Sequence, residues 1–80
     1  MKVTGKNIVI TGGASGIGKA LAERFHKEGA KSVTVADLQD GPLQEVAASV
    51  GGLAVICDVA KEDDILNLIA KAEEAYGQID

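Results

Sequence analysis

Residues 11–18, TGGASGIG, place glycines at a spacing that suits a loop around a phosphate group. Counted from Gly12, they follow the pattern G-x-x-x-G-x-G, which continues through Gly16 and Gly18. A loop between a buried strand and a helix gathers backbone N–H groups at the positive end of the helix dipole, and both attract an anion. Glycine suits such a loop because it reaches backbone angles that other residues avoid and lets a pyrophosphate come close. The stretch therefore predicts a phosphate-binding loop.

A second interpretation of the same letters starts at Gly13 and gives G-x-x-x-x-G-K, one residue short of the P-loop of nucleotide triphosphatases. The next residue is Ala20, so the hydroxyl group that binds Mg²⁺ in a P-loop is missing, and Lys19 has no metal ion to work with. Residues 33–37 still imitate the strand that carries a second magnesium ligand. A P-loop nucleotide hydrolase therefore remains an alternative hypothesis.

An acidic residue further along the chain favours the first interpretation. Asp37 ends the next apolar segment, about 20 residues after the glycine loop, which is the spacing at which a carboxylate meets the ribose hydroxyls of a dinucleotide. An isolated glycine cluster is as often a plain tight turn. Here a preceding strand, a following helix and the distant carboxylate occur together, and together they predict a dinucleotide site.

Other residues that could carry chemistry are few. Cys57 is the single cysteine, which excludes a disulfide within the chain, and no cysteine or histidine pair has metal-ligand spacing. We expect Cys57 to be a small buried hydrophobe and His26 to be a solvated surface residue. The acids at 62–64 fall where the first turn of a helix collects negative charge. No metal site is predicted.

The elements that must position these residues alternate along the chain. Short apolar or β-branched runs predict strands at 7–11, 32–37 and 53–57. Apolar residues at helical spacing predict helices over 17–28, from Gly41-Pro42 to residue 50, and over 61–76. The expected apolar face is Ile17, Ala20, Leu21 and Phe25 in the first helix and Ile65, Leu68, Ile69, Ala72 and Tyr76 in the third. The order β-α-β-α-β-α predicts an α/β fold with a parallel sheet.

Length, composition and charge narrow the classes of function. Eighty residues make at most one small domain, and 46% hydrophobic with 25% charged residues is typical of a globular chain. The net charge of −4, with scattered basic residues, argues against a nucleic-acid partner. No apolar run approaches the roughly 20 residues of a membrane span, so no membrane partner is predicted. We expect a cytoplasmic protein.

The glycine loop resembles a known motif. Residues 11–18 match TGxxxGxG of the short-chain dehydrogenase/reductase family, and Asp58-Val59 is similar to the adenine-contacting Asp-Val pair of that family. The similarity covers all 80 residues and includes the ending YGQID, which leads into a fourth strand in relatives. The resemblance implies the first half of a doubly wound Rossmann sheet in the strand order 3-2-1, with two helices on one face and the third on the other. Residues 1–80 would then be the N-terminal half of a dinucleotide-binding domain from a longer chain.

The resemblance also implies a role for each matched position. Around the pyrophosphate, Gly12, Gly16 and Gly18 would shape the loop, Ser15 would offer a hydroxyl, and Ile17 would offer a backbone N–H and an apolar side chain toward the nicotinamide. Around the adenosine, Asp37 would bind the ribose 2′- and 3′-hydroxyls, Leu38 would flank the adenine, and Asp58 with the Val59 backbone would meet the adenine edge. The implied cofactor is NAD, because the Asp37 carboxylate would repel the 2′-phosphate of NADP.

The same resemblance places the catalytic residues outside the chain. The tyrosine of the family lies in a Tyr-x-x-x-Lys motif, whereas the fourth residue after Tyr76 is Asp80, so Tyr76 is predicted to be a packing residue. The catalytic serine, an Asn-Asn-Ala-Gly stretch and Tyr-x-x-x-Lys would all follow residue 80. The parent would be an NAD-dependent oxidoreductase and homo-oligomer that transfers hydride between NAD(H) and an alcohol or carbonyl substrate. A non-catalytic dinucleotide-binding fragment is a further alternative.

Overall fold

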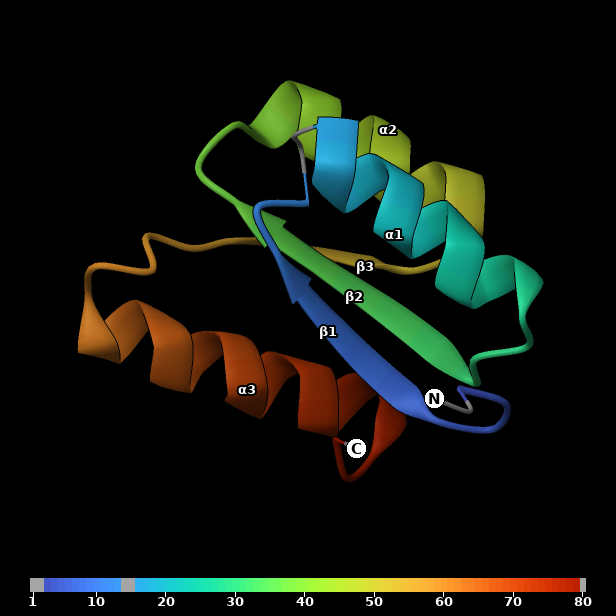
Figure 1. Ribbon diagram of the computed structural model, residues 1–80. Coiled ribbons are helices and arrows are strands. Elements are labelled where there is room, and N and C mark those ends of the chain that lie inside the picture. Colours follow the sequence, from blue (N-terminus) through green and yellow to red (C-terminus); the bar gives the residue numbers. More distant parts are fainter. Residues whose placement is uncertain (1–2, 14–15, 80) are drawn as a thin grey trace.

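The computed structural model describes residues 3–13 and 16–79 and confirms the alternating order of elements. Within these residues three strands form one sheet: β1 (Asn7–Thr11), β2 (Ser32–Asp37) and β3 (Leu53–Ile56). Each strand is followed by a helix, α1 (Gly16–Lys27), α2 (Asp40–Val50) and α3 (Glu62–Tyr76) in turn. Figure 1 shows the sheet edge-on between the helices.

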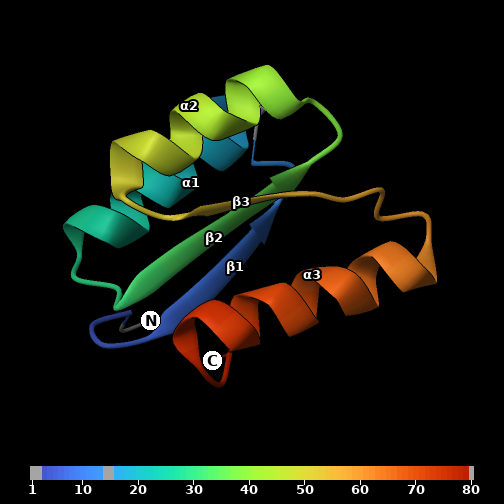
Figure 2. The same ribbon diagram turned by 180° about the vertical axis from the view of Figure 1, so that it is seen from behind.

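The sheet is parallel throughout the described residues, with β2 in the middle. Ile8 pairs with Val33, and Val35 pairs with Ala54 on the other side. The strand order is β1-β2-β3, and the same sheet reads 3-2-1 from its opposite edge. Because parallel strands all end on the same side, the loops that lead into the helices gather at one end of the sheet. This carboxyl end lies on the left in Figure 1 and on the right in the reverse view of Figure 2.

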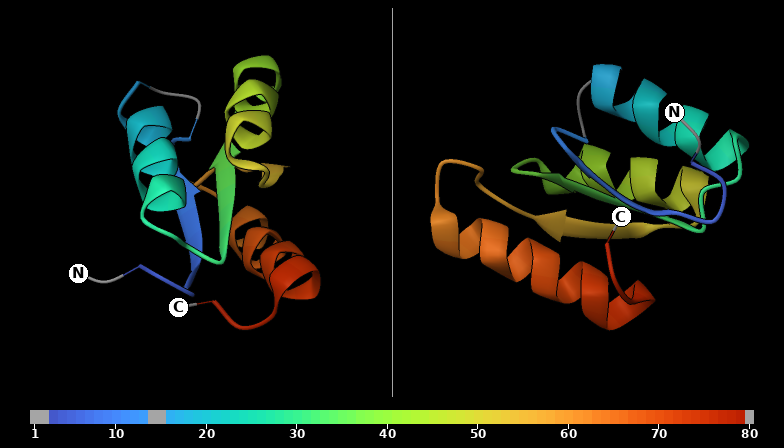
Figure 3. Two further views of the ribbon diagram at one scale, coloured as in Figure 1. Left: turned by 90° about the vertical axis from the view of Figure 1, so that its right-hand side faces the viewer. Right: turned by 60° about the horizontal axis from the view of Figure 1, so that its bottom comes forward.

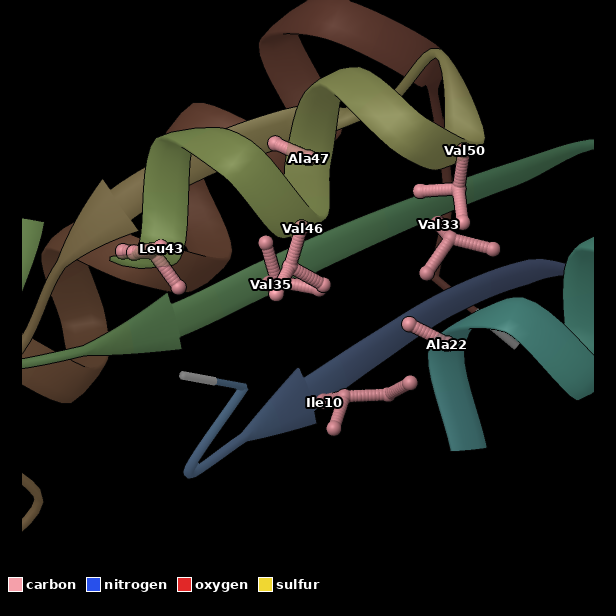
Figure 4. Close-up of a cluster of buried hydrophobic side chains, with 8 residues drawn as sticks. All are labelled: Ile10, Ala22, Val33, Val35, Leu43, Val46, Ala47 and Val50. Atoms are coloured by element: carbon pink, nitrogen blue, oxygen red, sulfur yellow. The ribbon is translucent and has the colours of Figure 1, made fainter. Parts of the chain in front are cut away.

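The helices cover the two faces of the sheet unequally. In Figures 1 and 3, α1 and α2 lie side by side on one face and α3 lies on the other, as the sequence predicted. The α1/α2 face holds the larger core, in which side chains of β2 meet those of α2 and Ile10 lies near Ala22 (Figure 4). Its buried members are all aliphatic: Ile10, Ala22, Val33, Val35, Leu43, Val46, Ala47 and Val50.

The α3 face holds a smaller core around Ala36, Val55, Cys57 and Leu68. Cys57 is 2% exposed, which confirms the expectation of a buried hydrophobe. Burial raises the pKa of its thiol, and the carboxylates of Asp64 and Asp58 raise that pKa further. The thiol is therefore held in its neutral, unreactive form.

The inner face of α1 differs from the predicted one. Ile17 and Leu21 are 78% and 42% exposed, whereas Gly18 and Ala22 are buried. The first turn of α1 lies so close to the glycine loop that a Cβ atom on Gly18 would come within 2.1 Å of the Gly12 carbonyl oxygen. Large side chains do not fit there, so small residues line the contact. The predicted stripe was wrong at Ile17, Ala20 and Leu21, because the large residues Ile17 and Leu21 set its position on the helix. Phe25 does pack against the core.

The start of α2 also differs slightly from the prediction. The helix begins at Asp40, with Gln39 as the N-cap, so Pro42 is the third helical residue instead of the first. This shift costs no hydrogen bond, because the N–H groups of a first turn have no partner within the helix. The predicted stop is confirmed, since Gly51 adopts the left-handed conformation with φ 61°.

Candidate functional site

Two backbone hydrogen bonds align the loops at the carboxyl end of the sheet. The Gly13 N–H donates to the Ala36 carbonyl at 3.0 Å, and the Cys57 N–H donates to the Asp37 carbonyl at 3.0 Å. The first bond links the glycine loop to the end of β2, and the second links the end of β2 to the end of β3. The structure thus brings residues 12–13 and 16–18 of the predicted loop to the same edge as residues 37–38 and 58–59, and we call this edge the carboxyl row.

Glycines shape the first segment of the carboxyl row in different ways. Gly12 has a φ of 69°, which L-residues with side chains rarely adopt. Gly18 is required by the close approach of α1 to the loop. Gly16, the first residue of α1, is exposed, and a Cβ atom there would meet nothing within 4 Å. Ser15, the predicted hydroxyl donor of this segment, lies outside the described residues.

Gly13 is a member of the loop that sequence reasoning missed. A Cβ atom there would lie 2.7 Å from the Val35 Cβ and 3.3 Å from a Leu43 methyl group. Gly13 therefore rests directly on the larger core. The G-x-x-x-G-x-G pattern assigned no role to this glycine, which entered only as the first residue of the alternative P-loop pattern.

The second segment combines a carboxylate with an apolar side chain. Asp37 is half-buried, and its Oδ1 accepts the Leu38 N–H at 2.6 Å, which holds the carboxylate at the end of β2. Leu38 is 62% exposed. Ile17 in the first turn of α1 and Val59 after β3 are likewise exposed, at 78% and 57%. Apolar side chains therefore stand open to solvent beside the polar groups of the row.

The third segment is a tight turn after β3. Asp58 is half-buried, and its Oδ1 accepts the Ala60 N–H at 2.9 Å while its carbonyl accepts the Lys61 N–H at 2.9 Å. The Val59 N–H has no hydrogen-bond partner among residues 3–13 and 16–79. A carboxylate and a backbone donor thus stand next to each other at this end of the row.

The carboxyl row combines a glycine loop at the start of α1 with acidic residues at the ends of β2 and β3, and known proteins have similar sequences. The sequence profile of the family described as short chain dehydrogenase matches residues 6–80. The chain belongs to this family. A match over this length favours the G-x-x-x-G-x-G interpretation of the loop over the P-loop one, which already lacked its hydroxyl at Ala20.

Individual relatives support the same assignment to the short-chain dehydrogenases. The chain is 49% identical to tropinone reductase-like 1 of Erythroxylum coca over 81 residues, which cover 99% of this chain and 29% of that protein. A short chain dehydrogenase/reductase from Burkholderia phymatum, solved in complex with NAD, superposes with a TM-score of 0.92 at 30% identity, covering 99% of this chain and 30% of that one. A 3-ketoacyl-(acyl-carrier-protein) reductase from Brucella melitensis, complexed with NADH, gives 0.91 at 38% identity, with 98% and 33% covered. The chain thus spans about a third of the length of these relatives.

Tyr76, His26 and a pocket of this short-chain dehydrogenase segment lie away from the carboxyl row. Tyr76 ends α3 at the opposite, amino end of the sheet, where its carbonyl oxygen accepts the Asn7 Nδ2 at 3.1 Å. His26 is exposed on α1. A shallow pocket of about 340 Å³ lies between Leu53 of β3 and the last turns of α3, and its lining shares no residue with the row.

Among the residues that the structure describes, no group of at least three histidine, cysteine or acidic side chains is placed to hold a metal ion. None of the helices there combines the length and the apolar character that crossing a lipid bilayer requires.

Proposed function

We propose that the chain is the cofactor-binding segment of an NAD-dependent short-chain dehydrogenase and that NAD(H) lies along the carboxyl row. The observation that carries this proposal is the alignment of the glycine loop, Asp37 and Asp58-Val59 on one edge, beside the start of α1. In open α/β sheets, ligands bind outside the carboxyl ends of the strands. The similar structures that contain NAD or NADH support the choice of ligand.

The pyrophosphate of the cofactor would lie over the glycine loop. Gly16 leaves open space at the first turn of α1, where backbone N–H groups without helical partners and the helix dipole favour an anion. Gly12 and Gly18 would keep the loop close to the helix, and the Ser15 hydroxyl would add a donor. The exposed Ile17 would turn its apolar side chain toward the nicotinamide half.

The adenosine would lie over the ends of β2 and β3. The Asp37 carboxylate would accept hydrogen bonds from the ribose 2′- and 3′-hydroxyls, and the exposed Leu38 would cover one side of the adenine. The Asp58 carboxylate and the Val59 N–H would meet the adenine edge as an acceptor and a donor. Each of these residues binds and orients the cofactor, and none contributes to the chemical step.

The chemical step would belong to the rest of the parent protein. When bound, NAD supplies a hydride acceptor and NADH a hydride donor, while the protein orients the nicotinamide and excludes competing reactions. We propose an alcohol or carbonyl substrate, and a parent enzyme that works in the cytoplasm as a homo-oligomer, with residues 1–80 forming the first half of its dinucleotide-binding domain.

The choice of NAD over NADP tests the assignment of Asp37. A 2′-phosphate within about 4 Å of this carboxylate meets a repulsion of roughly 1 to 4 kcal/mol per charge pair, depending on the effective dielectric. The full-length protein should therefore bind NADH at least about tenfold more tightly than NADPH in calorimetric titrations. Mg·ATP is the control ligand and should give no heat of binding. Equal affinities for NADH and NADPH would contradict the role given to Asp37. Binding of Mg·ATP without binding of either dinucleotide would instead support the P-loop hypothesis.

A further inference from the structure

The acidic residues at the start of α3 are not equivalent. Glu62, Asp63 and Asp64 all lie in its first turn, where negative charge opposes the helix dipole. Glu62 and Asp63 are exposed, and among the described residues their side chains make no hydrogen bond or ion pair. Asp64 is half-buried, and its Oδ2 accepts the backbone N–H of Asp58 at 2.9 Å. A dipole effect accounts for acids at all of these positions, whereas the contact with the loop is particular to Asp64.

This contact completes the set of bonds that hold Asp58. The Asp58 carbonyl already accepts the Lys61 N–H, and its Oδ1 accepts the Ala60 N–H, each at 2.9 Å. With the bond that the Asp58 N–H donates to Asp64, both backbone groups and one carboxylate oxygen of Asp58 have partners. The direction of the Asp58 side chain is therefore set by bonds on each side of its Cα atom.

The same bonds leave a matched pair of polar groups available. In the part of the chain that the structure describes, neither the second carboxylate oxygen of Asp58 nor the Val59 N–H has a hydrogen-bond partner. One is an acceptor and the other a donor, on consecutive residues at the end of the carboxyl row. The edge of an adenine ring offers the complementary pair, an amino group beside a ring nitrogen.

We propose that Asp64 is a positioning residue for the adenine end of the cofactor, an inference that rests on the function proposed above. Asp64 does not touch the ligand. It holds the Asp58 backbone in the orientation in which the free carboxylate oxygen and the Val59 N–H point outward together. Groups that are oriented before binding lose less conformational freedom on binding, so removing Asp64 weakens adenine recognition without removing any contact to adenine.

The test compares ligands that contain or lack adenine, bound to the full-length protein and followed by calorimetry. Asp64→Ala should raise the Kd of NADH and of AMP roughly tenfold and leave the Kd of nicotinamide mononucleotide unchanged. Asp64→Asn keeps an oxygen acceptor at the same position and should bind both adenine ligands within about twofold of the unsubstituted protein. Asp63→Ala removes the same charge from the same helical turn and should have no effect.

Several outcomes would overturn the positioning role. These are an equal loss in Asp63→Ala, a loss in Asp64→Asn as large as in Asp64→Ala, or a matching loss for nicotinamide mononucleotide. If every variant binds NADH and AMP as tightly as the unsubstituted protein does, the role of Asp64 is rejected and the proposed function stands. A full-length protein that binds neither NADH nor AMP rejects both.

A second measurement needs no variant and so does not depend on whether Asp64→Ala folds. Amide hydrogen exchange of the unsubstituted full-length protein should show the Asp58 amide protected without nucleotide. The Val59 amide should exchange quickly until AMP is added and then slow at least about tenfold. A rapidly exchanging Asp58 amide, or a Val59 amide that AMP does not protect, contradicts the proposal.

Discussion

The two ends of the sheet use similar polar residues in opposite ways. At the amino end, Asn7 is 7% exposed, and its Nδ2 donates to the carbonyl oxygens of Tyr76 at 3.1 Å and Gln78 at 2.8 Å. Its Oδ1 accepts the hydroxyl of Ser32, which is 8% exposed, at 2.8 Å. At the carboxyl end, the carboxylates of Asp37 and Asp58 accept N–H groups one and two residues further on, and both residues remain partly exposed.

The difference lies in burial and in the separation of the bonded partners along the chain. Asn7 joins the start of β1 to the end of α3, across 69 and 71 residues, so its hydrogen-bonding capacity serves the fold. The carboxylates of the carboxyl row use part of their capacity for local turns, and exposed groups nearby can meet a ligand. A buried polar group with distant partners therefore indicates a structural link, and a half-exposed one with local partners indicates a candidate binding residue.

The largest effect that tests this comparison is expected at Asn7. Asn7→Ala removes the bonds to the buried Ser32 hydroxyl and to the part-buried carbonyl groups of Tyr76 and Gln78. The loss of these hydrogen bonds should lower the free energy of unfolding by about 3 kcal/mol. Denaturant titration of the full-length protein measures this loss. Asn67→Ala, an exposed asparagine of α3, is the control and should change stability by less than about 0.5 kcal/mol. The NADH affinity of the folded Asn7→Ala protein should stay unchanged, and a large fall would show that the two ends are not separate.

A smaller effect is expected at Asp37, on the affinity for NADH instead of on the free energy of unfolding. Asp37→Ala should weaken NADH binding by about 1.5 to 3 kcal/mol, because it removes charge-assisted hydrogen bonds to the ribose, and it should reduce the preference for NADH over NADPH. Calorimetric titration of the full-length protein with both cofactors measures each change. The exposed Asp63→Ala serves as the charge control. An unchanged Kd for NADH would make Asp37 a plain strand-ending residue.

The smallest effect is expected in the middle of the sheet, between the two ends. Thr34 is 1% exposed, and its hydroxyl has no hydrogen-bond partner among the described residues. Thr34→Val replaces this hydroxyl with a methyl group of similar size and should raise the free energy of unfolding by about 1 kcal/mol. Ser32→Ala, two residues earlier on β2, should lower it, because that hydroxyl bonds Asn7. Equal signs for the two variants in denaturant titrations would contradict this distinction.

The alternation of elements and the carboxyl row could be predicted because their signals are local. Apolar runs, helical spacing and the glycine loop each lie within a few residues, and parallel strands then bring Asp37 and Asp58 to the same edge. The Asn7 link could not be predicted in this way, because its partners at residues 76 and 78 are far away in sequence and contribute carbonyl groups that every residue has. The inner face of α1 was missed because its buried residues, Gly18 and Ala22, are small, while the larger Ile17 and Leu21 give a stronger hydrophobic signal on a neighbouring face.

The contact between Gly13 and Val35 has a consequence for redesign of this protein. In the loop that we assign to the cofactor, Gly13 lies so close to the larger core that even a methyl group on it would overlap the Val35 side chain. Filling that core with bulkier residues is a common route to heat resistance, but at positions 35 and 43 added volume would press on the loop from below. Substitutions meant to raise the free energy of unfolding should therefore be made on the α3 side of the sheet, where Leu68 and Ala72 pack away from the loop.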